Sequence, residues 1–389
     1  MRQVCLINPP QTQLLLPRAY IPLGLGSLAA VLEEASVDVS ILNLADCTDI
    51  SKVELPESEW YGITCVSATY TNTKKLVSML RDKGKTIVGG PHPSVAPEET
   101  RDDMKPDVVM TGEAQYLLRD LVLGKAEPTP IMKAGLIQDL NVLPFPARHL
   151  FDREDIVDRT GIHGQEKGIP ATTVITAMGC PYACFFCCKS HPMFNWYRFR
   201  DASLVCDELR FLMDEYKIEH VRFVDDEFTL NTKRTADLMK KMKPLDLTWV
   251  CITRADTLDK PLLKLMKEAR CKEVHIGVET GSDRLLRLMN KQTTSDILLK
   301  GVQMIKDAGI GVKAYLMANY PGETEKDRNL TVEWMVKAKP DKFTLSNFTP
   351  LPGSATSQYL KVKGGVWFYP DEDDDFIRYR EQLSEAMQC

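Results

Sequence analysis

Three closely spaced cysteines are the strongest constraint on how this chain can fold. Residues 179–187 read GCPYACFFC, so Cys180, Cys184 and Cys187 have the spacing C-x3-C-x2-C. The segment directly follows a strand-like apolar run at 172–176. Thiolates are soft ligands that suit iron–sulfur clusters or zinc. The pattern predicts a thiolate-rich site at the carboxyl end of a strand.

That strand opens a series of six βα-type repeats. Strand-like runs occupy 172–176, 220–224, 248–252, 273–278, 312–317 and 342–347, and helix-like segments occupy 203–216, 232–242, 260–268, 294–308 and 325–337. A full eight-fold barrel typically needs about 250 residues, and these repeats take up fewer. We expect a partial, open barrel over residues 171–350, with its chemistry at the C-terminal ends of the strands.

Three interpretations of the cysteines are open. Zinc takes four tetrahedral ligands, and the nearby candidates are Cys188 and His191. Cys188 is adjacent to Cys187, and two neighbouring side chains can hardly reach one metal ion. The thiols could also hold no metal. A cluster held by three cysteines leaves one iron without a protein ligand, and that iron can bind a small molecule. The position of the motif within a βα repeat favours the cluster.

The N-terminal part alternates in the same way. Apolar runs at 3–7, 38–42, 61–66, 86–88 and 107–110 are separated by helix-like stretches at 24–34, 71–83, 97–103 and 114–123. This pattern predicts an α/β, doubly wound, Rossmann-like domain over residues 1–125. Ligands of such sheets bind at the carboxyl ends of the strands. Those ends are rich in Gly, Pro and small polar residues, which let a flat ligand approach the backbone.

Two further segments complete the predicted organisation. Residues 126–170 contain five prolines and little periodicity, so we expect a linker. Residues 351–389 are expected to form a short C-terminal cap. Its acidic run at 371–375 is interpreted as a solvated cap or turn, and its aromatic residues are interpreted as the core of the cap: Trp367, Phe368, Tyr369 and Phe376.

Composition excludes several classes of protein. The chain has 49 Lys and Arg against 54 Asp and Glu, a net charge of −5, which excludes a globally basic nucleic-acid binder. The 11 cysteines are too sparse for a disulfide scaffold. Cys5, Cys65 and Cys251 lie in apolar runs and are expected to be reduced core residues, which indicates a cytoplasmic protein. No signal peptide is expected at the N-terminus, and no stretch reaches the roughly 18 apolar residues of a membrane span.

The cysteine motif, its place after the first strand, Phe186 before the third cysteine and the six repeats resemble the radical S-adenosylmethionine (SAM) superfamily over residues 171–350. The resemblance implies that Cys180, Cys184 and Cys187 hold a [4Fe–4S] cluster whose free iron chelates the amino and carboxylate groups of SAM. It also implies that one electron cleaves SAM to methionine and a 5′-deoxyadenosyl radical, which abstracts hydrogen from a substrate. A flavodoxin or ferredoxin would supply the electron.

The resemblance extends to the ends of the later strands. It implies that Asp225, Asp226 and Glu227 bind the SAM amino group, that Arg254 pairs with the SAM carboxylate, and that Glu279 and Ser282 bind the ribose and methionyl part. The segment 320–324 resembles the family's proline-glycine-glutamate turn, and 348–354 would lie near the adenine. The alternative is structural, because acids also cap helix N-termini.

The N-terminal half resembles the cobalamin-binding domain that precedes the barrel in one large subgroup of this superfamily. The matching pieces imply cobalamin contacts from Asn8, Ser67, Gly89, Gly90, His92, Gly112 and Glu113. The Asp-x-His-x-x-Gly signature of a lower axial histidine is absent, so His92 is not expected to ligate cobalt. The alternatives are a doubly wound domain without the cofactor, and a dinucleotide site, although the full G-x-G-x-x-G is missing.

The leading prediction from both resemblances is a cobalamin-dependent radical SAM methyltransferase that acts on an unactivated carbon of a small-molecule or peptide substrate. A rearrangement or cyclisation enzyme with the same cofactors is the first alternative. A methylthiotransferase would need a second cluster, for which Cys5, Cys47 and Cys65 are the remaining cysteines of the N-terminal domain. A non-catalytic iron–sulfur or cobalamin sensor is the last alternative. Nucleic acid and membrane are not expected as partners.

Overall fold

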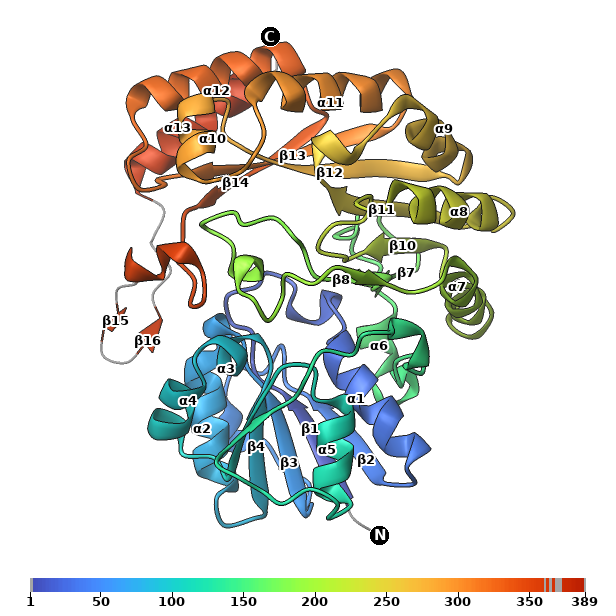
Figure 1. The fold of residues 1–389 in the computed structure, drawn as a ribbon, viewed down its shortest axis with the longest axis vertical. Helices are drawn as coiled ribbons and strands as arrows, with labels where there is room; N and C mark the ends of the chain where they lie inside the picture. The colour runs from blue at the N-terminus through green and yellow to red at the C-terminus, as the bar shows by residue number, and fades with distance from the viewer. Residues whose placement is uncertain (1–2, 360–361, 364–365, 368–372, 388–389) are drawn as a thin grey trace. The chain divides into compact units, whose positions relative to one another are not determined.

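The computed structural model describes residues 3–359, 362–363, 366–367 and 373–387, and it divides into two compact units (Figure 1). The first unit comprises residues 1–158 and 360–368, and the second comprises residues 159–359 and 369–389. None of the helices in the described residues combines the length and the apolar character that a bilayer span requires.

The first unit is built on a six-stranded parallel sheet with the order β2-β1-β3-β4-β5-β6. Figure 1 shows α1 and α5 on one side of this sheet and α2 and α4 on the other. The strands are β1 (Gln3–Asn8), β2 (Asp38–Asn43), β3 (Trp60–Thr64), β4 (Lys85–Gly89), β5 (Val108–Thr111) and β6 (Ile131–Lys133). The helices are α1 (Leu23–Glu34), α2 (Tyr70–Leu80), α3 (Pro91–Val95), α4 (Pro97–Met104), α5 (Gln115–Val122) and α6 (Arg153–Ile156). The predicted doubly wound fold is confirmed.

Buried apolar strands explain why this sheet forms. Val4, Cys5, Leu6 and Ile7 of β1 are all buried, since β1 lies between β2 and β3 with helices over both faces. The strand order reverses on either side of β1. Ligands of open α/β sheets bind at the carboxyl ends of strands near such a reversal. Short 3-10 helices join the elements: η1 (Pro17–Ala19), η2 (Ile50–Lys52), η3 (Ser67–Thr69), η4 (Leu140–Val142) and η5 (Arg148–Leu150).

The segment 126–170, for which the sequence predicts a linker, contributes to this unit. β6 pairs with β5 over three residues and extends the sheet by one strand. A three-residue strand is too short to show a period in the sequence. The boundary between the two compact units falls at Asp158 and Arg159, within the predicted linker.

The second unit contains the predicted partial barrel. Its six-stranded parallel sheet has the order β14-β13-β12-β11-β10-β7, and β14 and β7 are its two edges. The strands are β7 (Ala171–Val174), β10 (His220–Phe223), β11 (Thr248–Thr253), β12 (Cys271–Glu279), β13 (Gly311–Ala318) and β14 (Lys342–Asn347), with a small ribbon of β8 (Ala177–Met178) and β9 (Arg198–Phe199). Each predicted strand is present within about two residues of its expected ends.

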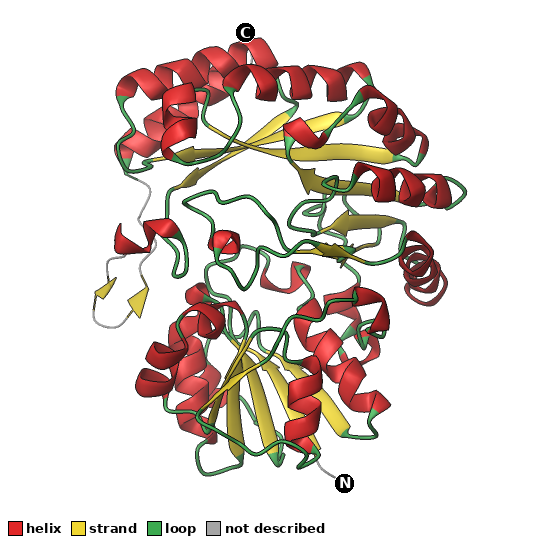
Figure 2. Ribbon diagram, in the orientation of Figure 1, coloured by secondary structure: helices red, strands yellow, loops and turns green. Residues whose placement is uncertain are grey.

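Helices cover one face of this sheet, as Figure 2 shows. They are α7 (Ala202–Tyr216), α8 (Thr232–Met242), α9 (Lys260–Glu268), α10 (Asp283–Leu288), α11 (Ser295–Asp307), α12 (Glu325–Ala338) and α13 (Asp374–Ala386). The connections of this unit also contain the 3-10 turns η6 (Cys188–Ser190), η7 (Ala255–Thr257) and η8 (Ala355–Tyr359). The strands alternate accordingly: in β13, Val312, Ala314 and Leu316 are buried, whereas Lys313 and Tyr315 are half-buried.

The predicted C-terminal cap contains α13. Asp373 is its N-cap, and its carboxylate accepts a hydrogen bond from the Phe376 backbone N–H at 2.8 Å. The described part of the acidic run therefore starts a helix, where carboxylates offset the exposed N–H groups. Phe376 is buried, as the cap interpretation predicts. Residues 371–372, Phe368 and Tyr369 lie outside the described residues, and so does the side chain of Trp367.

We expect Asp373→Ala to destabilise α13 locally. Loss of an N-cap costs about 1 kcal/mol, so hydrogen exchange of the α13 backbone amides should accelerate about fivefold. Asp374→Ala is the matched control, because Asp374 is exposed and lies in the first turn without being the cap. Equal acceleration in both variants would show that the cap bond contributes nothing specific.

Candidate active site

The three motif cysteines lie in one loop at the carboxyl end of β7. All three are free thiols. Cys184 is buried, and Cys180 and Cys187 are half-buried. Burial raises the pKa of the Cys180 thiol to about 11. Thiols in this setting are protonated unless a nearby cation stabilises the thiolate, and iron supplies such a charge.

The loop is fixed by hydrogen bonds from outside it. Gly179 has a φ of +87°, and a Cβ there would lie 2.1 Å from the carbonyl oxygen of Trp196, so only glycine fits. The Gly179 N–H donates to Asp226 Oδ2 at 2.9 Å, and the Phe185 N–H donates to the Met289 carbonyl at 2.9 Å. The Asn290 side chain donates to the Ala183 carbonyl at 2.7 Å.

The donor set fits a cluster of several irons. Among the described residues, no three His, Cys, Asp or Glu side chains converge as they would around a single metal ion. In a cubane each thiolate binds a different iron, so its ligands need not converge on one point. Cys180, Cys184 and Cys187 would hold three irons, and the fourth would stay open for SAM.

The acidic residues after β10 link the loop to neighbouring strand ends. The Asp225 carboxylate is buried and accepts hydrogen bonds from the backbone N–H (2.6 Å) and hydroxyl of Thr176. Burial raises the pKa of Asp225 to about 6. Asp226 accepts from Gly179 and pairs with Lys189 Nζ at 3.1 Å. Asp225 thus holds the end of β7, and Asp226 holds the start of the thiol loop at Gly179.

Glu227 and Arg254 join the ends of β10 and β11. Glu227 Oε1 accepts from the Arg254 N–H at 3.1 Å and from the hydroxyl of Thr253. Arg254 makes a two-pronged pair with Asp256 at 2.9 and 2.7 Å. Its guanidinium lies 3.7 Å from the ring centroid of Tyr182 in the thiol loop. Arg254 thus lies against the loop. Its pairing with the SAM carboxylate, which the resemblance implies, stays a prediction.

The two predicted residues after β12 differ in their surroundings. Ser282 is the N-cap of α10, and its hydroxyl donates to Asp327 Oδ1 at 2.6 Å. Ser282 therefore has a structural role in this loop. Glu279 is nearly buried, has a φ of +65°, and its Oε1 accepts from Lys291 Nζ at 2.7 Å. The sequence did not indicate Lys291, because α10 and the turn after it were not predicted.

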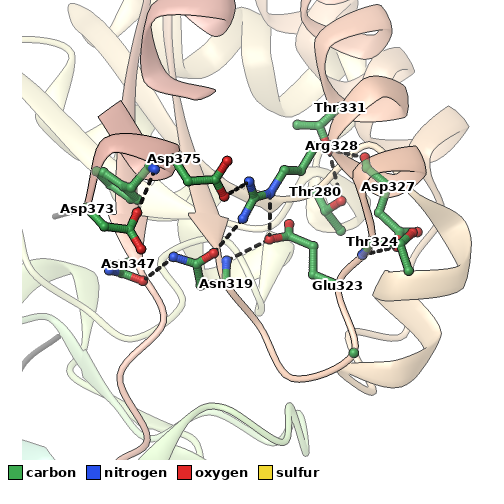
Figure 3. Close-up of polar contacts among 12 residues, drawn as sticks. Thr280, Asn319, Glu323, Thr324, Asp327, Arg328, Thr331, Asn347, Asp373 and Asp375 are labelled. Carbon is green, nitrogen blue, oxygen red and sulfur yellow. Dashed lines mark hydrogen bonds and ion pairs between the residues drawn. The ribbon is translucent and has the colours of Figure 1, made fainter. Parts of the chain in front are cut away.

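The proline-glycine-glutamate turn after β13 forms part of a polar network (Figure 3). Glu323 Oε2 accepts from the Asn319 N–H at 2.7 Å and from Arg328 Nε at 3.2 Å. Asn319 also donates to Asn347 Oδ1 at 3.1 Å, and Arg328 pairs with Asp375. The network joins the ends of β13 and β14 to α12 and α13, so the turn has a clear structural role.

A second network that the sequence did not indicate lies between strands of the same sheet. His275 Nε2 contacts Glu273 Oε1 at 2.7 Å, and His275 Nδ1 contacts the Tyr315 hydroxyl at 3.0 Å. Arg222 donates to the same hydroxyl at 3.2 Å, and Lys342 pairs with Glu273. Ionisable side chains on one face of a barrel sheet replace the branched apolar residues that normally fill it.

In the first unit, the predicted cobalamin residues lie at the carboxyl ends of the strands. Gly90 has a φ of +108° and Gly112 a φ of +80°, conformations that favour glycine. A Cβ would lie 2.9 Å from the Cys65 carbonyl oxygen at Gly90 and 2.5 Å from the Ala134 carbonyl oxygen at Gly112, so the neighbouring backbone also requires glycine at both positions. Gly89 ends β4 beside Gly90. Asn8 donates to Asn43 Oδ1 at 2.8 Å, and Glu113 accepts from the Ile137 N–H at 2.6 Å. A backbone that lacks side chains at these strand ends fits a large flat ligand.

His92 lies in the core of this unit. It is 1% exposed, its Nδ1 contacts the Ser67 hydroxyl at 3.0 Å, and its ring packs edge-on against Tyr70. Burial lowers the pKa of His92 to about 4, so the imidazole is neutral at physiological pH. Ser67 and His92 therefore contact each other. That His92 does not ligate cobalt stays a prediction, and the buried, neutral imidazole is its physical basis.

Cob(II)alamin bound to the protein should consequently give an electron paramagnetic resonance spectrum without splitting from a protein nitrogen. The His92→Gln variant should give the same spectrum. Nitrogen splitting in the native protein that disappears in His92→Gln would contradict the buried position of the imidazole.

The assignment of the thiols is tested by substitution. After anaerobic reconstitution with iron and sulfide, Cys184→Ala should lose the iron–sulfur absorbance and most of the bound iron. Cys188→Ala is the matched control, because Cys188 is the next cysteine in the same segment but lies outside the spacing. The reverse pattern would show that the wrong thiols are assigned.

Comparison with known proteins agrees with this architecture. The family model of the radical SAM superfamily matches residues 174–335, and that of the B12 binding domain matches residues 16–122. An uncharacterised methyltransferase of Pyrococcus horikoshii is 29% identical, over 87% of this chain and 78% of the relative. An anaerobic magnesium-protoporphyrin IX monomethyl ester cyclase of Rubrivivax gelatinosus is 24% identical, over 88% of this chain and 64% of the relative.

The fold is shared with a solved protein. The radical SAM methyltransferase TsrM from Kitasatospora setae, solved with cobalamin and a [4Fe–4S] cluster, superposes with a TM-score of 0.73 at 16% identity, over 92% of this chain and 77% of that chain. The two domain matches, in this order, together with the thiol loop at the first strand of the partial barrel, identify the chain as a radical SAM enzyme that carries a B12-binding domain, with a [4Fe–4S] cluster, SAM and cobalamin as its cofactors.

Proposed function

We propose that this enzyme transfers a methyl group to an unactivated carbon of a small-molecule or peptide substrate. The observation that carries the proposal is the combination of two units in one chain: a partial barrel with a three-thiol loop at its first strand, and a B12-binding domain. When bound, the cluster and SAM supply the radical that activates the substrate, and cobalamin supplies the methyl group. The methyltransferase of Pyrococcus horikoshii and TsrM, to which the chain is similar, support this choice.

The chain's own residues would bind and orient these groups. Cys180, Cys184 and Cys187 would hold the cluster, because they are free thiols on one braced loop. Arg254 would pair with the SAM carboxylate, and the carboxylates of Asp226 and Glu279 would accept hydrogen bonds from its amino and ribose groups. Asp225 and Glu227 would contribute indirectly, because their hydrogen bonds hold neighbouring strand ends together.

In the first unit, cobalamin would lie over the carboxyl ends of the strands. The half-buried Gly89, Gly90 and Gly112 would contact it, with Asn8 and Glu113 at the neighbouring strand ends. Ser67 and His92 would shape this surface through their mutual hydrogen bond. A flavodoxin or ferredoxin would supply the electron that the cluster needs.

A second candidate function is ring formation without net methyl transfer. The cyclase relative, which spans 88% of this chain, favours it. A methylthiotransferase fits less well, because Cys5 is buried in β1 and Cys65 is buried directly after β3. These two thiols are therefore poor ligands for the second cluster that such an enzyme needs.

The enzyme class is tested with the reconstituted, cobalamin-loaded protein. With SAM and a strong reductant under anaerobic conditions, we expect formation of 5′-deoxyadenosine, and the Cys184→Ala variant should form none. With SAM labelled in its methyl group, the label should appear on bound cobalamin. Absence of 5′-deoxyadenosine and of label transfer would overturn the proposal. Formation of 5′-deoxyadenosine without label on cobalamin would favour the cyclase type.

A further inference from the structure

The turn Met289–Gln292 is a junction between the thiol loop and two strand ends. The Met289 carbonyl and the Asn290 side chain bind the thiol loop at Phe185 and Ala183. The next residue binds the strand ends: the Lys291 carbonyl accepts from Arg254 Nη1 at 3.0 Å. Four consecutive residues thus connect elements that are distant in sequence.

The side chain of Lys291 extends into the interior. The residue is 7% exposed, and its ammonium donates to Glu279 Oε1 at 2.7 Å. The ammonium also lies 5.6 Å from the ring centroid of Phe186, the residue before the third cysteine. A buried ion pair adds little to stability compared with apolar side chains of similar volume. Its presence beside the thiol loop therefore needs a reason other than folding.

The backbone around the pair is adapted to it. A Cβ on Gly277 would lie 2.9 Å from Lys291 Nζ and 2.7 Å from Glu279 Oε1, so a larger residue at Gly277 would collide with the ion pair. The register between β12 and β13 shifts between Gly277 and Glu279. Glu279 itself has a φ of +65°, and Gln292, next to Lys291, has a φ of +55°. Asn290 has a φ of +50° because it ends α10 in the ordinary left-handed way. Left-handed backbone in such residues is costly and clusters at functional sites.

We propose that Lys291 is a positioning residue for SAM, which holds the carboxylate of Glu279 in place and ties it to the thiol loop. The inference rests on the proposed function, in which Glu279 accepts hydrogen bonds from the ribose of SAM. Lys291 occupies Oε1 of Glu279, and Oε2 has no hydrogen-bond partner among the described contacts, so Oε2 is the oxygen that receives the ribose hydroxyls. Lys291 belongs to the turn Met289–Gln292, which also binds the thiol loop. The position of Glu279 Oε2 therefore depends on the turn that holds this loop.

The test measures SAM binding to anaerobically reconstituted, full-length protein in four forms: the native protein, Lys291→Met, Glu279→Gln and the double variant. Lys291→Met should bind SAM at least tenfold more weakly, with iron content and cluster absorbance unchanged. The double variant should bind no more weakly than the weaker single variant, since both substitutions disable one carboxylate. Lys300→Met is the matched control, because Lys300 is exposed on α11, and it should bind SAM as the native protein does.

A second readout reports on the geometry at the cluster. SAM alters the electron paramagnetic resonance spectrum of a reduced cluster that it ligates. At a fixed SAM concentration, Lys291→Met should show a smaller altered fraction than the native protein. Native affinity in Lys291→Met, or strictly additive losses in the double variant, would overturn the inference. Failure of the native protein to bind SAM would instead overturn the proposed function.

Should Lys291→Met lose the cluster because Glu279 is left buried without its partner, a second variant carries the test. The second variant is Gly277→Ala, which keeps the charges of Lys291 and Glu279 and places its added methyl group against this ion pair alone. We expect it to weaken SAM binding in the same direction with the cluster retained. A Gly277→Ala protein with native SAM affinity would count against a positioning role for the Lys291–Glu279 pair.

Discussion

The thiol loop takes its shape from hydrogen bonds to the rest of the barrel. Residues 180–187 contain no helix or strand, so contacts with other parts of the barrel hold this loop in place. Asp226 binds it at Gly179, the turn after α10 binds it at Ala183 and Phe185, and Arg254 stacks on Tyr182. The segments that follow β10 and β11 and the turn after α10 therefore determine where the cysteines lie. A precise cofactor site on a loop requires this kind of support from rigid elements.

The sequence predicted most of the strands and longer helices, because apolar runs and helical patterns alternate repeatedly along the chain. Each strand of the two sheets except β6 was visible as an apolar run, and α7 to α9, α11 and α12 as helical patterns. Elements of a few residues were missed: β6, α3 and α10 are too short to show a period. The failure to predict α10 had the largest consequence, because Lys291 lies in the turn that follows this helix. From the sequence alone, a lysine in such a position is expected at the surface. Only the tertiary structure shows that Lys291 is buried beside Glu279.

The acidic residues show a different limit of sequence reasoning. From the sequence, Asp225 could bind SAM or cap a helix. In the structure its carboxylate accepts from the end of β7, a contact that depends on which strands are neighbours. Glu227 likewise bridges to β11. Neither residue is the N-cap of α8, whose cap is Asn231. The resemblance located these residues at the correct edge of the sheet, but their individual partners required the strand order.

Residues with a left-handed backbone occur in two settings, at the ends of helices and at the strand ends that form the candidate site. Lys105, Lys217 and Lys339 adopt positive φ where α4, α7 and α12 end, which is the ordinary way to satisfy terminal carbonyls. Glu279 and Asn319 adopt it at the carboxyl ends of β12 and β13, where no helix end requires it. Each is held by an ionic or amide partner, Lys291 for Glu279 and Arg328 for Asn319. Because strained residues persist only where their surroundings fix them, the carboxyl edge of this sheet is stabilised by its polar contacts at the cost of local backbone strain. Substitutions of those partners should therefore impair the site before they unfold the barrel, whose core lies on the helix-covered side of the strands.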